Sequence, residues 1–188
     1  FLCKERRMEN LIEKPLDNFR LGCSSYLLKN PKNIERLLEK QVQMHPENPL
    51  YNFSLGNLYY EKGDVRQAEI YYKNALTLSP ENPEVLNNLA WLYATSKIPE
   101  LRKPQQALTL AQKAAQLDPK PYILDTLGES YFINGYYAEA VRAIEQAISA
   151  KPDNLQYYKN QLNKFKRYLD GDEEPEQPPD EDSHRYAI

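Results

Sequence analysis

One period runs through most of this chain and constrains its fold more than any other feature. A Leu-Gly pair, replaced by Leu-Ala in one copy, recurs at intervals of 34, 34 and 38 residues, at Leu21-Gly22, Leu55-Gly56, Leu89-Ala90 and Leu127-Gly128. A proline follows 12 residues after a small or aliphatic residue in the same frame, at Pro46, Pro80, Pro119 and Pro152. Two independent marks share this frame, and they predict four repeats at residues 15–48, 49–82, 83–120 and 121–154.

Each repeat has the pattern of two helices joined by a tight turn. In residues 49–82 the apolar residues fall at helical spacing in two runs, and a glycine able to adopt a left-handed turn lies between them at Gly63. Asn-Pro pairs at 48–49 and 82–83 offer an N-cap followed by proline in the first helical turn. The small residue after each repeated leucine lets the paired helices approach closely. The sequence therefore predicts an all-α fold of about four stacked hairpins, in a right-handed superhelical solenoid.

The two ends of the chain differ from the repeats. Residues 155–169 continue as an amphipathic helix with basic residues on its polar side, which we expect to cap the solenoid. Residues 170–188 hold eight acids and one arginine, so they predict an acidic flexible tail with a net charge of −7, against +4 for residues 1–169. The tail is expected either to remain a solubilising segment or to dock, on the basic capping helix or on a neighbouring subunit.

Residues 1–14 allow two interpretations. "FLC" followed by "KERR" resembles the last residues of an upstream membrane anchor meeting a basic stop, and a trimmed or processed terminus explains the same letters. Membrane contact is therefore expected only through an anchor missing from this sequence. Cys3 and Cys23 have neither zinc-site spacing nor the density of a disulfide scaffold, and we expect free thiols rather than a bridge.

Several function classes are disfavoured by the composition and by the motifs. A net charge of −3 does not favour a nucleic-acid partner. His45 and His184 lie in a connecting turn and in the acidic tail, outside any recognisable nucleophile motif. Phosphate-binding, HExxH and paired-cysteine patterns do not occur. We therefore expect no catalytic residues, no metal site and no cofactor.

The order of Leu-Gly, Tyr, Ala, aromatic, Ala and Pro within a repeat resembles the tetratricopeptide repeat family over residues 15–154. The resemblance is strong in residues 49–82 and 121–154, weaker in 15–48, and in 83–120 it is interrupted by about five extra residues around "TSKIPELRKPQ". The phrases "NNLAWLYAT" and "ILDTLGESYF" are similar to those of bacterial envelope-associated members. That similarity leaves a cytoplasmic and an envelope-associated location both open.

The family implies a partner-binding concave surface lined by the first helix of each hairpin. Family positions carried over from the first repeat are Phe19, Cys23 and Tyr26. From the other three repeats they are Phe53, Asn57, Tyr60, Asn87, Asn88, Trp91, Tyr122, Asp125, Glu129 and Phe132. Aromatic rings interleaved with amides suit an extended peptide or a partner helix.

Some family members grip the acidic C-terminus of chaperones with a carboxylate clamp, and the resemblance lets that use be weighed here. Asn57 and Asn88 match the clamp, but Phe53, Tyr122 and Thr126 stand where its cations belong. We predict no such clamp and a neutral, apolar or basic ligand. The expected function is a non-catalytic adaptor or scaffold, within a membrane-associated bacterial assembly; the alternative is a structural subunit that self-associates through repeat ends or its acidic tail.

Overall fold

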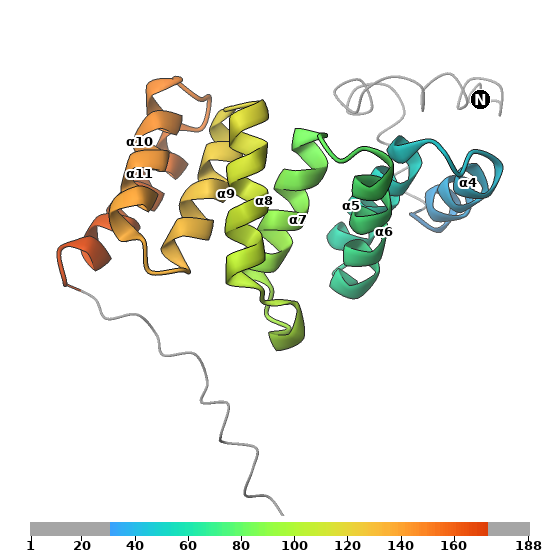
Figure 1. Cartoon of the computed structure of the whole chain (residues 1–188), viewed down its shortest axis with the longest axis horizontal. Coiled ribbons are helices and arrows are strands. Elements are labelled where there is room, and N and C mark those ends of the chain that lie inside the picture. The colour runs from blue at the N-terminus through green and yellow to red at the C-terminus, as the bar shows by residue number, and fades with distance from the viewer. Residues whose placement is uncertain (1–30, 173–188) are drawn as a thin grey trace, which may run out of the picture. The chain divides into compact units, whose positions relative to one another are not determined.

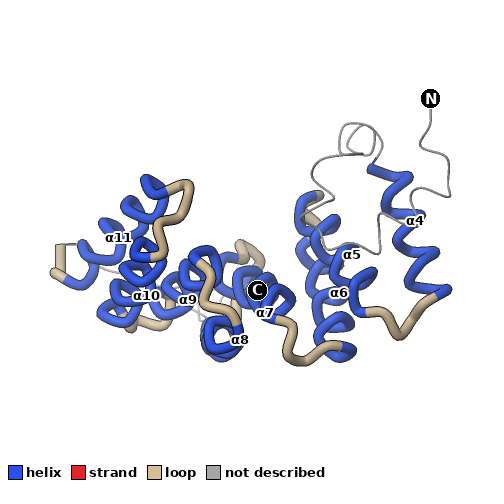
Figure 2. Tube along the Cα trace, turned by 90° about the horizontal axis from the view of Figure 1, so that it is seen from above, coloured by secondary structure: helices blue, strands red, loops and turns tan. Residues whose placement is uncertain are grey.

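The computed structural model describes residues 31–172, with the side chains of 31–33 left out of the description. The predicted segment 1–14, the first-repeat positions Phe19, Cys23 and Tyr26, and residues 173–188 of the predicted tail lie outside the described residues. Within 31–172 the chain forms eight α-helices and one short 3-10 helix, without a strand (Figure 2). The predicted all-α class is confirmed.

The helices follow the predicted hairpin order. The second helix of the first predicted repeat is α4 (Pro31–Met44). The three complete hairpins are α5 (Pro49–Glu61) with α6 (Val65–Leu78), α7 (Pro83–Thr95) with α8 (Pro104–Leu117), and α9 (Pro121–Phe132) with α10 (Tyr137–Ser149). The last described helix, α11, spans Leu155–Leu169, the range in which the sequence predicts a capping helix (Figure 1).

The chain divides into two compact units, Phe1–Leu78 and Ser79–Ile188. The first unit contains α4, α5 and α6. The second contains α7 to α11, and consecutive helices of this unit pack side by side. Within it α9 also packs against α7, so first helices of successive repeats are neighbours.

Side chains and glycines define the helix ends. Asn48 Oδ1 accepts a hydrogen bond from the Leu50 N–H at 3.0 Å, and Asn82 Oδ1 accepts from the Glu84 and Val85 N–H groups at 3.0 and 3.2 Å. These bonds are the predicted N-caps, and α9, which begins after Lys120, has no side-chain cap bond. The predicted left-handed glycine Gly63 has φ of 80° in its turn, and Gly135, in the turn between α9 and α10, has φ of 79°.

In the first unit, α5 and α6 meet where α5 has a glycine. A Cβ built on Gly56 would lie 2.5 Å from two ring carbons of Tyr72, so the Tyr72 ring occupies the space that a side chain would need. Tyr72 and the two alanines of α6 at 68 and 75 are fully buried. Toward α4, the Tyr59 hydroxyl donates to Glu35 Oε1 at 2.7 Å, and Lys62 pairs with Glu35 at 2.8 Å.

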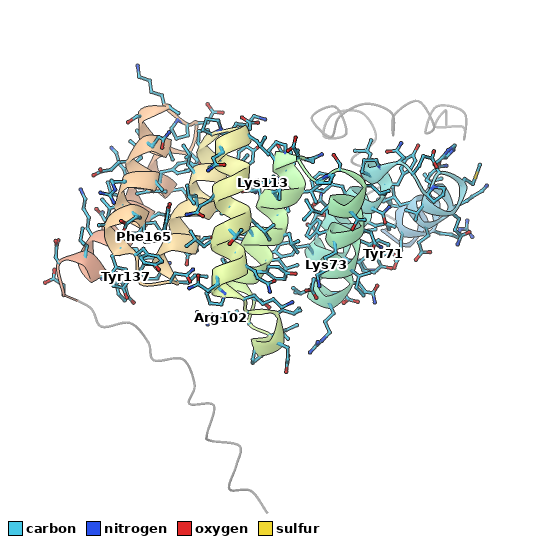
Figure 3. The ribbon with its side chains drawn as sticks, viewed as in Figure 1. Tyr71, Lys73, Arg102, Lys113, Tyr137 and Phe165 are labelled. Carbon is cyan, nitrogen blue, oxygen red and sulfur yellow. The ribbon has the colours of Figure 1, made fainter. Side chains whose placement is uncertain are left out.

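In the second unit, the core at the C-terminal end joins α9, α10 and α11. Phe165 of α11 is fully buried among Leu124 of α9 and Ile144 of α10. A Cβ on Gly128 would lie 3.1 Å from Phe165 Cε2, so the second unit also uses a glycine of a first helix for close packing. Figure 3 shows Phe165 and Tyr137 at the end of this unit where α10 and α11 lie.

The insertion in the third predicted repeat forms an ordered connection between α7 and α8. It contains the 3-10 helix η2 (Pro99–Leu101), and Leu101 is buried. The Lys103 N–H donates to the Tyr93 carbonyl at 3.1 Å, while Lys103 Nζ lies 4.5 Å from the centre of the Tyr93 ring. The loop is thus attached to α7 through both the backbone and the side chain of Lys103.

Candidate interaction surface

Helix α7 is buried around most of its circumference and leaves one narrow stripe half-exposed. Beyond the first-turn proline, the residues of α7 that are not buried are Glu84, Asn88, Trp91 and Thr95. Their spacing of four, three and four residues places them on a single helix face. We call these four residues the α7 stripe. The polar side chains and the indole ring of this stripe are partly exposed to solvent.

Tyr122 of α9 adjoins the N-terminal end of the α7 stripe. Its hydroxyl donates to Glu84 Oε1, and Lys120 Nζ lies 3.5 Å from the same carboxylate and 2.8 Å from Asp118. Burial and the bond to Glu84 raise the pKa of Tyr122 above its ordinary value, so the hydroxyl remains a donor. The Tyr122 side chain is nevertheless 39% exposed, which leaves its ring open to a ligand.

The middle of the α7 stripe combines an amide pair with an indole. Asn87 lies next to the stripe, is only 6% exposed, and donates through Nδ2 to Asn88 Oδ1 at 3.2 Å. Among the described residues, Asn87 Oδ1 has no hydrogen-bond partner. The Trp91 indole N–H likewise has no partner within residues 31–172 and is not buried. Three predicted site residues, Asn87, Asn88 and Trp91, are therefore together on α7.

The predicted site residues of α9 other than Tyr122 lie under α11. The Tyr157 hydroxyl donates to Asp125 Oδ2 at 2.7 Å, and Lys164 Nζ donates to both oxygens of Glu129 at 2.9 Å. The Phe132 ring packs at 5.1 Å from the Phe165 ring and at 4.7 Å from the Tyr168 ring, measured between centroids, with Lys164 Nζ 4.4 Å from its centre. In this conformation the capping helix of the same chain occupies these positions.

Asp125 has an unusual electrostatic environment. The side chain is 6% exposed and its Oδ1 has no partner among the described residues. Burial raises the pKa of Asp125 to about 6, against the opposing effect of the Tyr157 hydrogen bond, and the nearby Glu129 charge adds to the rise. The sequence did not reveal this shift, because the residues that bury Asp125 are distant in the chain.

In the first unit the three predicted site residues of α5 differ in exposure. Phe53 is buried, with its ring centroid 6.1 Å from that of Tyr72. Asn57 Oδ1 accepts from the Tyr72 hydroxyl at 2.8 Å, so this amide supports the hairpin. Tyr60 is half-buried. Of the two aromatic residues among them, Tyr60 therefore has the more accessible ring.

Several residues of these surfaces were missed in the sequence. Glu84 and Thr95 belong to the α7 stripe, and their helical spacing from Asn88 and Trp91 was a usable signal. Tyr157 and Lys164 contact Asp125 and Glu129 across separations of 32 and 35 residues. These separations are close to the length of one repeat. That similarity was the only sign in the sequence that the capping helix would take the place of a further repeat.

The fold and this surface define a repeat protein built from helical hairpins, in which α7 and α9 of the second unit, the first helices of two successive repeats, pack together. Residues 56–96 match the family model described as TPR repeat, and residues 121–154 match the one described as tetratricopeptide repeat. Residues 56–96 and 121–154 are thus tetratricopeptide repeats, as the sequence predicted. This family is generally a non-catalytic protein-interaction fold. A search of curated proteins found no significant match.

Solved structures agree on the fold. The crystal structure of MamA aligns with a TM-score of 0.62 at 22% identity, covering 73% of this chain and 77% of that one. The first TPR of Spaghetti (RPAP3), bound to the HSP90 peptide SRMEEVD, aligns with a TM-score of 0.57 at 23% identity, covering 65% and 94%. The Sgt2 TPR domain from Aspergillus fumigatus aligns with a TM-score of 0.55 at 25% identity, covering 71% and 89%.

The described part of the chain, residues 31–172, also bears on metal binding and on membrane insertion. There, no set of three or more His, Cys, Asp or Glu side chains is arranged to hold a metal ion. None of the helices in that same part combines the length and the apolar character that crossing a membrane requires.

Proposed function

We propose that this chain is a non-catalytic adaptor or scaffold that binds a protein segment, either an extended peptide or a partner helix. The binding surface in the second unit consists of the α7 stripe together with Asn87 and the ring of Tyr122. Tyr60 of α5 offers a further half-exposed ring in the first unit. The proposal extends the general role of the family to named residues of this chain.

The observation that carries this proposal is the environment of Trp91. Its indole is half-exposed in a stripe between buried positions, and its N–H has no hydrogen-bond partner among the described residues. A partner that covers this ring removes a large apolar area from water and can also accept the N–H bond. Tryptophan is among the residues that contribute most to binding when they are buried at an interface.

The charges near the stripe favour a neutral, apolar or basic ligand. Glu84 is the acidic residue of the stripe, and Lys120 is already engaged by Asp118 at 2.8 Å. At the positions where a carboxylate clamp has cations, Phe53 and Thr126 are buried, and Tyr122 donates to Glu84. An acidic peptide would lack charge-assisted donors there. We therefore propose that the chain does not bind chaperone C-termini through a clamp.

The adaptor proposal includes the absence of catalysis. Asp125 has the raised pKa that some catalytic acids have, but its carboxylate is buried and accepts a hydrogen bond from Tyr157. A group in this position supports the packing of α11 rather than a reaction with substrate. Recruitment of the partner to a membrane-associated bacterial assembly stays a prediction from the sequence.

Selection of random peptides displayed on phage, with the full chain as target, tests the proposal. Binding of the selected peptides is then measured by fluorescence anisotropy. Trp91→Ala is expected to weaken peptide binding by about 2 kcal/mol, which raises the dissociation constant about thirtyfold. The matched control, Tyr136→Ala, removes an exposed ring from the N-cap of α10 and should change affinity by less than about twofold. The HSP90 peptide SRMEEVD should not compete.

The outcomes separate the proposal from its alternatives. Thermal denaturation of both variants verifies that they remain folded. If folded Trp91→Ala binds the selected peptides as tightly as the unmodified chain, the α7 stripe is not the binding surface. If selection yields no peptides and the chain instead forms oligomers, the structural subunit that self-associates replaces the adaptor.

A further inference from the structure

Helix α11 carries a basic face that no described helix covers. Its members are Lys159, Asn160, Asn163, Lys166 and Arg167, and all five side chains are exposed. Their spacing of one, three, three and one residues places them along one side of the helix. We call them the α11 basic face. It combines three cationic groups with two amides that can donate hydrogen bonds.

The opposite sides of α11 fix its rotation. Tyr158 and Phe165 are buried in the core shared with α9 and α10. On the side toward α9, Tyr157 bonds to Asp125 and Lys164 bonds to Glu129. Two sides of the helix are thus engaged within the second unit. The α11 basic face is turned away from both of these sides, so the packing of α11 directs it outward.

Two acids of the described chain, Glu145 and Asp170, lie on or beside this face. Lys166 Nζ lies 3.2 Å from Glu145 Oε1, and both of these side chains are about half-exposed. Asp170, the C-cap residue of α11, falls on the same side of the helix as the basic face. An ion pair between exposed side chains is weak and exchanges readily with solvent, so Lys166 stays able to bind another anion.

The segment that follows α11 has the complementary charge. Residues 173–188 contain six acids and one arginine, a net charge of −5. They follow directly after Asp172, three residues beyond the end of α11. Sixteen extended residues reach about 50 Å, whereas the 15 residues of α11 span about 22 Å. The segment can therefore turn back and run along the whole helix in the same chain.

We propose that the acidic segment 173–188 docks on the α11 basic face of its own chain. Carboxylates of the segment pair with Lys159, Lys166 and Arg167 and accept hydrogen bonds from the two asparagine amides. The contact is held by exposed charges, so it is reversible and is weakened by salt. The covalent tether keeps the local concentration of the segment high, which favours its own chain over a second copy.

Paramagnetic broadening in the full chain tests this contact. A nitroxide is attached through Ala187→Cys in a chain that carries Cys3→Ser and Cys23→Ser, and the backbone amide signals of α11 are recorded by NMR. The informative signals are those of residues 156–163, because they lie farthest from the start of the tether. The reference is a tether of equal length in which the acids of the segment are changed to the corresponding amides, at Glu173, Glu174, Glu176, Asp180, Glu181 and Asp182.

Docking predicts stronger broadening of residues 156–163 with the acidic segment than with the neutral one. The difference should disappear at an ionic strength of 1 M, because the Debye length falls from about 10 Å at 0.1 M to about 3 Å at 1 M. The triple change Lys159→Gln, Lys166→Gln and Arg167→Gln should abolish it as well. The matched control of equal charge, Lys73→Gln, Lys97→Gln and Arg102→Gln, changes exposed bases elsewhere and should preserve it.

Two results would overturn the proposal. Equal broadening with the acidic and the neutral segment would mean that the segment samples the helix only through its tether. Broadening in a mixture of isotope-labelled chains without nitroxide and unlabelled chains with nitroxide, at the level seen within one chain, would assign the segment to a second copy instead.

Discussion

Gly56 is the residue at which the packing of the first unit tolerates an added side chain least. Alanine in a helix is favoured over glycine by about 1 kcal/mol, but the added methyl group would lie 2.5 Å from the Tyr72 ring. Tyr72 is fully buried and bonded to Asn57, so it has little room to move. Gly56→Ala is expected to destabilise the chain by about 1–2 kcal/mol, the usual cost of overpacking reduced by the helix propensity of alanine.

Gly128→Ala is the matched comparison in the second unit. Its methyl group would meet Phe165 Cε2 at 3.1 Å, which a small shift relieves. Urea denaturation followed by circular dichroism should therefore give a smaller loss for Gly128→Ala than for Gly56→Ala. An unchanged or increased stability of Gly56→Ala would contradict the packing described for α5 and α6.

Asp125 makes the stability of the chain depend on pH in a predictable direction. Its pKa is about 6 in the folded chain against an ordinary value of 3.8, so between these values the folded state binds more protons than the unfolded state. Stability from this group is present below about pH 4 and is lost as the pH rises through about 6. The total loss amounts to about 3 kcal/mol at most.

The variant Asp125→Asn isolates this effect because an amide does not titrate in that range. The difference in unfolding free energy between the variant and the unmodified chain should shift in favour of the variant between about pH 4 and about pH 7.5. Urea denaturation at the two pH values measures it, and any constant cost of the amide cancels. A difference that does not change with pH would show that Asp125 titrates as an ordinary exposed carboxylate.

At this scale the sequence located residues better than it located their contacts. Asn87, Asn88 and Trp91 come together on α7, as helical spacing requires. Asp125 and Glu129 were predicted from the family to face a ligand, yet in the structure they bond to Tyr157 and Lys164. The repeat frame gives the direction of a side chain within its own hairpin. It does not contain the side chains that a later helix brings against it.

The helices themselves follow from local signals, and their caps are testable elements. Asn82 Oδ1 accepts two backbone N–H groups at the start of α7, whereas Asn154, at the same position of α11, makes no side-chain cap bond. Asn82→Ala should therefore lower the free energy of unfolding by about 1 kcal/mol. Asn154→Ala is the control and should leave it nearly unchanged. Equal effects of the two substitutions in urea denaturation would argue against the cap.

Element boundaries were the most predictable feature of this chain. The signals for these boundaries are the Asn-Pro pairs, the turn glycines and the basic end of α11. Each of them depends on interactions within one helical turn. The connection containing η2 was harder, because its order depends on burial of Leu101 and on the bond from Lys103 to the Tyr93 carbonyl. Sequence spacing showed that residues were inserted there but not that they pack against α7.

For the whole molecule, the adaptor and the self-associating subunit predict different masses. The chain has a mass of 22.0 kDa, and an adaptor whose acidic segment docks within its own chain should remain at that mass at all concentrations. Light scattering over a concentration series, on the full chain and on a chain ending at Asp170, measures it. A mass that rises with concentration only when residues 171–188 are present would favour self-association through the acidic segment.

The division into two units has its own consequence for the proposed surface. The α7 stripe, Tyr122 and the hydrogen bond from Tyr122 to Glu84 belong to the second unit. The proposed binding surface is therefore complete within residues 79–188. Tyr60 belongs to the first unit, so its contribution is expected to be separable from that of Trp91.

Binding of a partner segment on the α7 stripe can be mapped by NMR, with a selected peptide added to the isotope-labelled full chain. We expect the largest shifts on the amides of residues 84–95 and of 120–123, and on the Trp91 indole N–H. Shifts confined to α10, α11 or the loop around η2, with the Trp91 signal unmoved, would contradict it.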